Sequence, residues 1–302
     1  MYGLSLKYAD RILLQLFKLL LVGAKKKISK YQTVHLFETK LKFSSKKQVL
    51  HIDDPEYTQI RVDELIKWEN SCISKSNVPI IICTNSYTYK WLATNLKSTK
   101  IFIVEQGYHS IVLNNDKRQN NFSCVYTSPY IHYGKDKHAK HSTWGSEILI
   151  DEIIPRLNLL DPEIHIHLVG QLGSDASQEL KKFRNVYIHG RVNFQKNIEI
   201  LSSCSVGIYP RNYDHKRSVL KIFSYIGAGL PIVTFDLIDT EVVKANSLGF
   251  AVDNTDEFIT SILDLKNSPE LMLKYEERIK KFRIDFTWSV LAGKMESILS
   301  GI

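Results

Sequence analysis

Short apolar runs alternate with amphipathic segments along the second half of the chain. Six of these runs are rich in β-branched and aromatic residues, as buried strands are. The segments between them have apolar residues at helical spacing. The predicted strands are 125–131, 164–170, 186–190, 206–210, 231–235 and 249–252. The predicted helices lie near 145–158, 175–183, 195–203, 219–228, 239–246 and 256–266, and two more follow at 268–282 and 288–300.

Strands that alternate with helices of this length predict βαβ units, and therefore a parallel sheet that is covered by helices on both faces. Ligands of such sheets bind outside the carboxyl ends of the strands. The loops that we expect to carry function therefore follow residues 131, 170, 190 and 210.

The first half of the chain shows the same alternation in a less complete form. A polar, turn-rich stretch at 112–123 is predicted to link the two halves. The fold class is therefore α/β, with two parallel-sheet domains. The predicted strands of the first half are 34–38, 49–53, 79–83 and 101–105, and its predicted helices lie near 8–22, 59–73 and 86–96.

The helix that follows the strand at 206–210 ends in Gly-Ala-Gly-Leu-Pro and is followed at once by another strand. Ile222 and Ile226 share one face of this helix, which is predicted to pack on the sheet. Gly227 and Gly229 lower the helix propensity. We expect them either to allow close approach of backbones or to end the helix before the proline.

Arg217, Lys221 and Ser224 are spaced four and three residues apart, which predicts a polar stripe on the other side of this helix. Near Ser218 the first helical turn offers free backbone N–H groups and the positive end of the helix dipole. Arg217 and Lys221 add full positive charge, so a diphosphate fits this position. An ordinary solvated basic loop would explain the same residues.

The net charge of +8 on 302 residues favours partners that carry phosphate or other negative charge. Nucleic acid is disfavoured as a partner, because the chain has neither an aromatic RNA-binding motif nor a Cys/His finger. The four cysteines are far apart and form no CxxC pair. Scattered thiols of this kind are expected to be reduced, which favours a cytoplasmic location.

An apolar run at 12–22 allows two interpretations. It is interrupted by Gln15 and Lys18 and is shorter than the about 20 residues that a membrane span needs. One interpretation is a buried helix. The other is a helix at a membrane surface, with the lysines that follow it facing anionic headgroups.

The sequence lacks the motifs of several other enzyme classes. The chain has no Asp-x-Asp, no complete GxGxxG, no GxSxG and no P-loop. His132, His138 and His141 lie in one polar segment, where a metal site is an alternative to a cleft loop with histidines. We expect no metal. His165 and His167 alternate on a predicted strand and are expected to be packed or hydrogen-bonded.

Four motifs together resemble GT-B glycosyltransferases of the group-4 superfamily. VGIYP…KRSVLKIFSYIGAGLPIV resembles the donor-site segment of that family. HIHLVGQLG (165–173), NVYIHGRV (185–192) and FTWSVLAGKMESIL (286–299) resemble its other motifs in the same order. The resemblance covers about residues 124–300. It is weaker in the first half, where FIVEQGY (102–108) and VLHIDDPEY (49–57) resemble strand ends that face the cleft.

The resemblance implies a GT-B-like fold of two Rossmann-like parallel-sheet domains, of which the N-terminal one is short. Residues 1–120 are expected to form the acceptor-side domain, 121–285 the nucleotide-sugar-binding domain, and 286–302 the closing helix. The first domain is shorter than in the family by one or two βα units, so either it is minimal or the chain lacks its start.

Residue roles follow from the resemblance. Lys221 corresponds to a lysine that contacts the diphosphate, and Ser224 to an acid that holds the ribose hydroxyls. Many relatives carry a second acid seven residues earlier. In this chain that place is near Lys216 or Arg217, so the second acid is absent. In the family, the strand at 185–190 usually presents its backbone to the base of the nucleotide. Arg191 and Val192 follow this strand.

Glycine-rich positions of the family are matched as well. Gly170 corresponds to the glycine that ends the strand beneath the nucleotide. The loop after residue 131 corresponds to the family's loop that faces the cleft. Gly134 would allow close backbone approach there, and Lys135 or Lys140 would meet the donor phosphates.

The implied activity is metal-independent transfer of a sugar from a nucleotide sugar to a glycan or lipid-linked acceptor. The implied setting is surface polysaccharide assembly at the inner face of the plasma membrane, with no cofactor besides the donor. Asp54 is the expected base, with Asp53, Glu105 and His109 as alternatives. The rival hypotheses are a non-catalytic GT-B partner and a sugar-nucleotide epimerase.

Overall fold

The protein divides into two compact units, which are described separately here. The N-terminal unit comprises Met1–Val104 with Leu299–Ile302, and the C-terminal unit comprises Glu105–Ile298. The predicted helices at 8–22 and 59–73 and the predicted boundary at 120 lie outside the described residues. The structure, a computed structural model, describes residues 34–37, 48–52, 80–95, 99–108, 121–134, 145–213 and 219–300.

The N-terminal unit contains a four-stranded parallel sheet in the order β1-β2-β3-β4. All four predicted strands are present, with ends that shift by one or two residues. Residues of β3 are all buried, as its continuous apolar sequence predicts. The elements are β1 (Val34–Phe37), β2 (Gln48–Ile52), β3 (Ile80–Cys83), α4 (Ser86–Asn95) and β4 (Lys100–Ile103).

The C-terminal unit is built on a six-stranded parallel sheet in the order β10-β9-β8-β5-β6-β7. This is the Rossmann order, in which the chain starts at the centre and winds outward in both directions. All six predicted strands are confirmed. They are β5 (Ser123–Ile131), β6 (His165–Leu172), β7 (Val186–Gly190), β8 (Val206–Tyr209), β9 (Ile232–Phe235) and β10 (Gly249–Val252).

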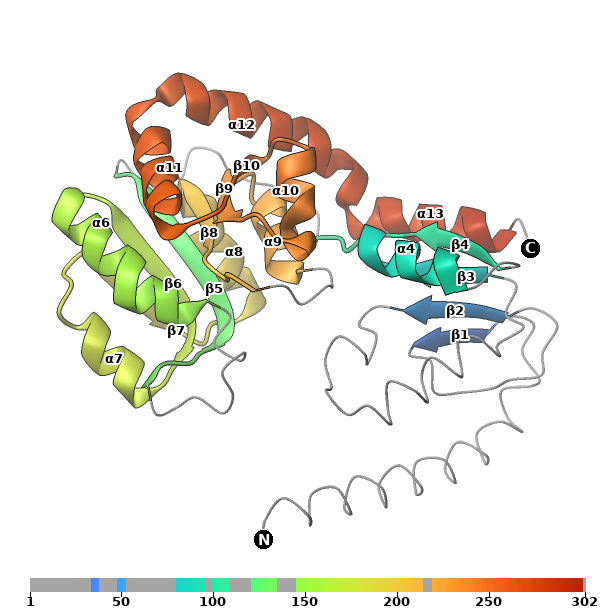
Figure 1. Ribbon diagram of the computed structural model, residues 1–302, viewed down its shortest axis with the longest axis horizontal. Coiled ribbons are helices and arrows are strands. Elements are labelled where there is room, and N and C mark those ends of the chain that lie inside the picture. The colour runs from blue at the N-terminus through green and yellow to red at the C-terminus, as the bar shows by residue number, and fades with distance from the viewer. Residues whose placement is uncertain are drawn as a thin grey trace, which may run out of the picture. The chain divides into compact units, whose positions relative to one another are not determined.

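Helices cover both faces of this sheet (Figure 1). Buried side chains of α6, α7 and α11 pack on one face, and those of α8, α9 and α10 on the other. The helices of this part are α5 (Ser146–Ile148), α6 (Ile154–Leu160), α7 (Ser174–Leu180), α8 (Phe194–Ser203), α9 (Leu220–Gly227), α10 (Glu241–Ala245) and α11 (Thr255–Asn267).

The helix predicted near 145–158 contains one π-helical turn, Leu149–Ile153, between α5 and α6. Pro155 occupies the first turn of α6. A proline has no backbone N–H and its ring clashes with the carbonyl of the preceding turn, so a regular α-helix would be disrupted here. The wider π turn accommodates it.

The geometry at the end of α9 explains why the helix is followed by Gly-Ala-Gly-Leu-Pro. Gly229 has φ +72°, the left-handed conformation that favours glycine. The N–H of Gly229 donates to the carbonyl of Ile226, and that of Leu230 to the carbonyl of Tyr225, both at 3.0 Å. This pair of bonds is the Schellman motif, and Pro231 then leads directly into β9.

The chain closes with α12 (Pro269–Phe282), a 3-10 turn over Arg283–Phe286, and α13 (Trp288–Ser300). Tyr108 lies beside this segment, because its N–H donates to the carbonyl of Phe286 and its carbonyl accepts from the N–H of Trp288. Its ring fills the space next to Gly227, where a Cβ would lie 2.5 Å from a ring atom. The group that approaches Gly227 closely is therefore a side chain and not a backbone, whereas the other expectation, an end of the helix before the proline, is confirmed at Gly229.

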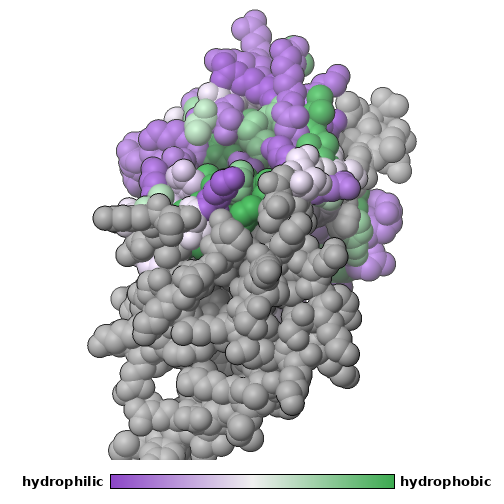
Figure 2. Space-filling model, turned by 90° about the vertical axis from the view of Figure 1, so that its right-hand side faces the viewer, coloured by the Kyte–Doolittle hydropathy of each residue, from purple (hydrophilic) through white to green (hydrophobic). Residues whose placement is uncertain are grey.

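The described surface is mixed in character. In the view of Figure 2, hydrophilic side chains predominate over the described part of the visible face, with hydrophobic ones in small groups between them. Within the ranges described, no helix has both the length and the apolar character needed to cross a membrane.

Candidate functional site

The Rossmann strand order creates a crevice at the point where the direction of winding reverses. In this protein the reversal falls between β5 and β8, which pair at the centre of the sheet. Tyr126 of β5 and Tyr209 of β8 are both fully buried at this place. The loop after β8 leads to α9, whose first turn faces the same edge. The candidate site is therefore the one predicted from the loop after residue 210.

Lys221 lies in the first turn of α9, and its ammonium group is buried. Its Nζ is 4.9 Å from the ring centroid of Tyr126 and 5.0 Å from that of Tyr209. Burial, together with the smaller effect of the positive charge of Arg211, lowers the pKa of Lys221 to about 7. Lys221 and Ser224 are both half-buried, on the less buried side of α9, but the ammonium of Lys221 turns inward against the two aromatic rings.

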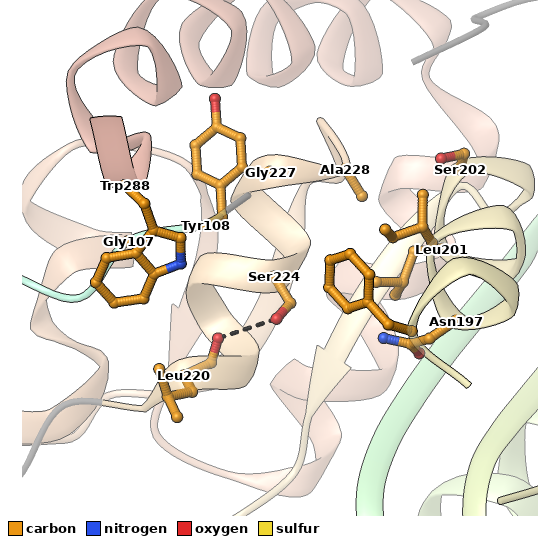
Figure 3. A pocket seen from close by; sticks show the side chains of 12 residues that line it. Gly107, Tyr108, Asn197, Leu201, Ser202, Leu220, Ser224, Gly227, Ala228 and Trp288 are labelled. Carbon is orange, nitrogen blue, oxygen red and sulfur yellow. Dashed lines mark hydrogen bonds between the residues drawn. The ribbon is translucent and has the colours of Figure 1, made fainter. Parts of the chain in front are cut away.

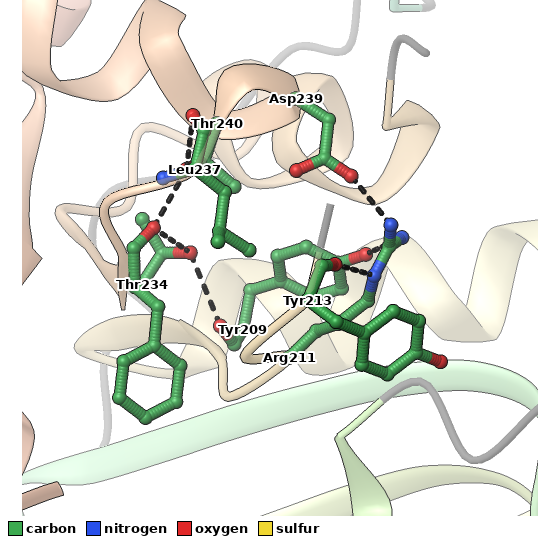
Figure 4. Close-up of polar contacts among 8 residues, drawn as sticks. Tyr209, Arg211, Tyr213, Thr234, Leu237, Asp239 and Thr240 are labelled. Atoms are coloured by element: carbon green, nitrogen blue, oxygen red, sulfur yellow. Dashed lines mark hydrogen bonds and ion pairs between the residues drawn. The ribbon is translucent and has the colours of Figure 1, made fainter. Parts of the chain in front are cut away.

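A buried ion pair fixes the loop after β8 (Figure 4). The side chains of Arg211 and Asp239 are completely buried, and Nη2 of Arg211 lies 2.8 Å from Oδ2 of Asp239. Arg211 also donates from Nη1 to the hydroxyl of Tyr209 and from Nε to the carbonyl of Tyr213, both at 2.8 Å. The ring of Tyr213 stacks 4.8 Å from the guanidinium. These contacts hold the described start of the loop, residues 211–213, and place a second cation near Lys221.

Sequence reasoning missed Arg211 as a site residue. The available signal was an arginine directly after a buried strand, since a charged side chain at that position must find a partner. The partner, Asp239, follows β9 and could not be assigned from the sequence. Burial also raises the pKa of Tyr209, so its phenol stays protonated beside the two cations.

The two predicted glycines have structural roles that the resemblance did not imply. Gly170 has φ +145°, and a Cβ there would lie 1.8 Å from the carbonyl oxygen of Ser128. It therefore allows β5 and β6 to approach closely. Gly134 has φ +59°, and the space next to its Cα is taken by the carboxylate of Asp175, 2.5 Å from a Cβ.

Arg191 and Val192 follow β7 at the carboxyl edge of the sheet. Arg191 is exposed and Val192 packs partly against the apolar cluster under α8 and α9. Asn193 caps α8, since its side chain accepts a hydrogen bond of 2.8 Å from the N–H of Lys196. The other predicted site residues lie outside the described residues: Asp53, Asp54, His109, Lys135, Lys140, Lys216, Arg217 and Ser218.

The predicted histidines divide into two groups. His165 and His167 do lie on one face of β6, and Nδ1 of His167 is 2.9 Å from Nε2 of His189. Burial lowers the pKa of His167 to about 4, and the neighbouring His189 and His165 act in the same direction. The ring of His132 lies 4.3 Å from the ring of Tyr130 and is tilted by 41° relative to it. Across the described ranges, no group of three or more His, Cys, Asp or Glu side chains is arranged to hold a metal ion.

A pocket of about 260 Å³ lies between α8 and α9 (Figure 3), and Ser224 is one of its lining residues. The hydroxyl of Ser224 donates to the carbonyl of Leu220 in the preceding turn, at 3.2 Å. Gly107, Tyr108 and Trp288 line the pocket together with the two helices. We call this pocket the α8–α9 groove. Its lining residues are Gly107, Tyr108, Phe194, Asn197, Ile198, Leu201, Ser202, Leu220, Ser224, Gly227, Ala228 and Trp288.

The strand order and the cations at the switch point define the C-terminal unit as a Rossmann-like α/β domain of the kind that binds anionic ligands at this edge. Residues 138–268 match the protein family described as glycosyl transferases group 1. Over these residues the C-terminal unit is similar to group 1 glycosyl transferases, which agrees with the resemblance that the four motifs carry. A search of curated protein sequences finds no match.

Solved structures of low sequence identity share the fold. HepE from Anabaena, solved with UDP, has a TM-score of 0.70 at 13% identity, over 94% of this chain and 82% of HepE. WaaG, a glycosyltransferase involved in lipopolysaccharide biosynthesis, has a TM-score of 0.67 at 11% identity, over 93% and 81%. TarM from S. aureus, in complex with UDP, has a TM-score of 0.64 at 14% identity, over 85% of this chain. The chain spans only about half of TarM, 52% of its length.

Proposed function

We propose that the protein transfers a sugar from a nucleotide-sugar donor to a glycan or lipid-linked acceptor. The observation that carries the proposal is the buried ammonium of Lys221 at the switch point of a Rossmann-ordered sheet. The group 1 family match supports it. HepE, which has a similar fold, has been solved with UDP and with UDP-glucose.

In this proposal the diphosphate of the donor lies at the start of α9. Departure of the nucleoside diphosphate develops negative charge, which Lys221 and Arg217 stabilise together with the backbone N–H groups near Ser218. Gly134 and Lys135 approach the phosphates from the loop after β5. Because protein cations balance the charge, the proposed reaction needs no metal.

The nucleoside end lies toward α8. Backbone groups of Arg191 and Val192 face the base, Gly170 lies beneath the nucleotide, and Ser224 contacts the ribose. Serine accepts a neutral hydrogen bond where an acid would give a charge-assisted one, so this contact is weaker than in the family pattern. Asp54 is the proposed base that takes the proton of the acceptor hydroxyl.

The proposed setting is surface polysaccharide assembly at the inner face of the plasma membrane, in a chain with GT-B architecture. Its support is the role of WaaG in lipopolysaccharide biosynthesis and the net charge of +8, which favours contact with anionic lipid.

The direct test is nucleotide release from UDP-, GDP- and TDP-sugars in the presence of a cell-envelope extract as acceptor source, with a chelator added. We expect acceptor-dependent release from one donor, and a loss of about 100-fold in Lys221→Met, because one preorganised cation at the leaving group is removed. Lys182→Met, which changes an exposed lysine of an ion pair with Glu179, is the matched control. Release that requires a divalent metal would contradict the metal-independent mechanism.

A second candidate is a non-catalytic GT-B partner. It is favoured by one observation: the serine at the ribose position, whose hydroxyl is already bonded to Leu220 of its own helix. Nucleotide binding with no release from any donor, in the same assay, would identify this function. Isomerised donor without acceptor would instead identify an epimerase.

A further inference from the structure

Each of the three nitrogens in the Arg211 guanidinium points to a protein group (Figure 4). Nη2 lies 2.8 Å from the carboxylate of Asp239. Nη1 donates to the hydroxyl of Tyr209 and Nε to the carbonyl of Tyr213, both at 2.8 Å. The side chain has no exposed area, so Arg211 is not placed to touch a ligand, and any part that it has in the site must act through a neighbour.

The backbone at Arg211 is closely packed as well. A Cβ on Gly145, the residue before α5, would lie 2.5 Å from the backbone nitrogen of Arg211, so this approach requires a glycine. The carbonyl of Tyr209 accepts a hydrogen bond of 3.1 Å from the hydroxyl of Thr234 on β9. Contacts from the start of α5 and from β9 therefore fix where the charge of Arg211 lies.

The neighbour through which Arg211 can act is Tyr209, whose phenol lies against two cations. Its hydroxyl accepts the bond from Arg211, and its ring centroid is 5.0 Å from Nζ of Lys221. The guanidinium carbon of Arg211 is 6.0 Å from the same centroid. Tyr209 is fully buried, so little water screens the repulsion between the two positive charges.

The two cations differ in whether they can lose their charge. A guanidinium keeps its proton in proteins, and that of Arg211 is paired with Asp239. An amine can release its proton, and burial together with the charge of Arg211 lowers the pKa of Lys221 to about 7. The rings of Tyr126 and Tyr209 also face Lys221, but burial raises the pKa of both phenols, so both are uncharged near neutral pH. Among the described residues, Arg211 is therefore the charged group that acts on Lys221.

We propose that Arg211 is a positioning residue of the anion site, a fixed like charge held by the hydroxyl of Tyr209, which makes Lys221 take up a proton from solvent when a diphosphate binds. In the free protein the repulsion favours the neutral amine of Lys221. The negative charge of a bound diphosphate outweighs that repulsion, so the ammonium forms on binding and its proton returns to solvent when the diphosphate leaves. The inference rests on the proposed function, which supplies the diphosphate as part of a nucleotide.

The test measures the protonation of Lys221 directly, by NMR of the full chain with ¹³C-labelled lysine. The Cε resonance of Lys221 is the one that is absent in Lys221→Met, and its chemical shift is followed as the pH is raised through neutrality. We expect a titration midpoint near 7 in the wild type. Arg211→Met/Asp239→Leu removes both charges of the ion pair and fills their place with apolar groups, so the midpoint should move upward.

Asp239→Asn should move the midpoint in the opposite direction. It keeps the guanidinium charge and removes the carboxylate that offsets it, so Lys221 should hold its proton less well. Loosening of the fold would instead admit water and raise the midpoint, so a purely structural role of the ion pair predicts the other sign. Ile262→Val is the matched control, because it weakens the core under α11, on the other face of the sheet from α9, and should leave the midpoint unchanged.

Binding of UDP, GDP and inorganic pyrophosphate connects the effect to the anion. Titration calorimetry in two buffers of different ionisation enthalpy measures the protons taken up on binding. We expect uptake of about half a proton per site at pH 7 in the wild type, because the free amine is about half protonated there, and less in Arg211→Met/Asp239→Leu.

The outcomes separate this proposal from the proposed function. Equal midpoints in the wild type and Arg211→Met/Asp239→Leu, or a raised midpoint in Asp239→Asn, would overturn the role of Arg211 whether or not a nucleotide binds. Nucleotide binding without proton uptake would also overturn it and would leave the proposed function standing. Midpoint shifts of the expected signs, with proton uptake on binding of pyrophosphate but no binding of either nucleotide, would uphold the role of Arg211 and overturn the proposed function alone. If none of the three anions binds, both are overturned.

Discussion

At the scale of single residues, the environment of Lys221 decides what the site can do. A buried ammonium loses its hydration, and the faces of Tyr126 and Tyr209 return only part of the lost stabilisation. Its pKa of about 7 means that charged and neutral forms are both populated near neutral pH. An anion that binds beside Lys221 favours the charged form, so anion binding is coupled to proton uptake.

The first prediction concerns the pH dependence of diphosphate binding. The pKa of Lys221 is about 7 in the free protein and rises when an anion is bound. As the pH increases above 7, the free protein loses the proton that the complex keeps, so affinity for UDP or GDP falls, by at most about tenfold per pH unit. Titration calorimetry between pH 7 and 9 measures this slope, and Lys221→Met should abolish it while weakening binding. Equal slopes in the two proteins would show that another group titrates.

Two residues of the site could not be predicted from the sequence, for different reasons. Asn197 is a polar residue beside the buried Ile198 and Leu201 of α8. The sequence shows this position, but it does not show which group Asn197 would contact. Arg211 depends on Asp239, and their pairing arises only when β8 and β9 lie side by side. Lys221 is visible in the sequence as a lysine in the first turn of a helix, but the burial of its ammonium depends on the rings of Tyr126 and Tyr209, which come from β5 and β8.

At the scale of elements, the ion pair of Arg211 and Asp239 joins the loop after β8 to the turn after β9. Both side chains are completely buried, so the pairing offsets part of the free energy that each charge loses on leaving water. The pair therefore ties the described start of the loop after β8 to the turn after β9.

The second prediction follows from this burial. Asp239→Asn removes the carboxylate that Asp239 places 2.8 Å from the buried Arg211 and should lower the free energy of unfolding by about 3 kcal/mol. The double variant Arg211→Met/Asp239→Leu should recover much of the loss. Urea unfolding measures both. Glu179→Gln, which breaks an exposed ion pair with Lys182, should cost less than about 1 kcal/mol. If Asp239→Asn costs no more than Glu179→Gln, the pair is not a structural element of the loop.

The third prediction concerns the end of α9. Gly229→Ala forces an alanine into the left-handed conformation and should destabilise the protein by about 1–2 kcal/mol. Gly293, within α13, has no atom within 4 Å of a Cβ, so Gly293→Ala should instead stabilise by about 0.5–1 kcal/mol. Thermal unfolding compares the two, and effects of the same sign would contradict the assignment of the Schellman motif.

Positions of elements along the chain were predictable, because buried strands and amphipathic helices leave local patterns. The ends of β5 to β10 agree with the predictions within two residues. The π turn before α6 was not predicted. A proline such as Pro155 can kink a helix, end it or cause a bulge, and the sequence does not distinguish these outcomes.

At the scale of the whole molecule, the pattern predicted a parallel sheet but not its strand order. The order β10-β9-β8-β5-β6-β7 depends on which strands pair over long sequence separations, and local periodicity carries no information about this. The resemblance to a known family supplied it instead. In the N-terminal unit, Asp54 as the base remains a prediction, because it lies outside the described residues.

The two units have different parts in the proposed reaction. The proposed diphosphate and nucleoside contacts all belong to the C-terminal unit, Glu105–Ile298, whereas Asp54 belongs to the N-terminal unit. Donor binding therefore tests the account without any knowledge of the acceptor.

The most direct test of the central claim, a nucleotide-sugar site at Lys221, is thermal unfolding in the presence of UDP, GDP, CMP or TDP without added metal. A ligand at about 100 times its dissociation constant should stabilise the protein by about 2.7 kcal/mol. The account predicts an increase in melting temperature with one of these nucleotides, absent in Lys221→Met and retained in Lys182→Met. An unchanged melting temperature with all four nucleotides, or an equal increase in Lys221→Met, would contradict it.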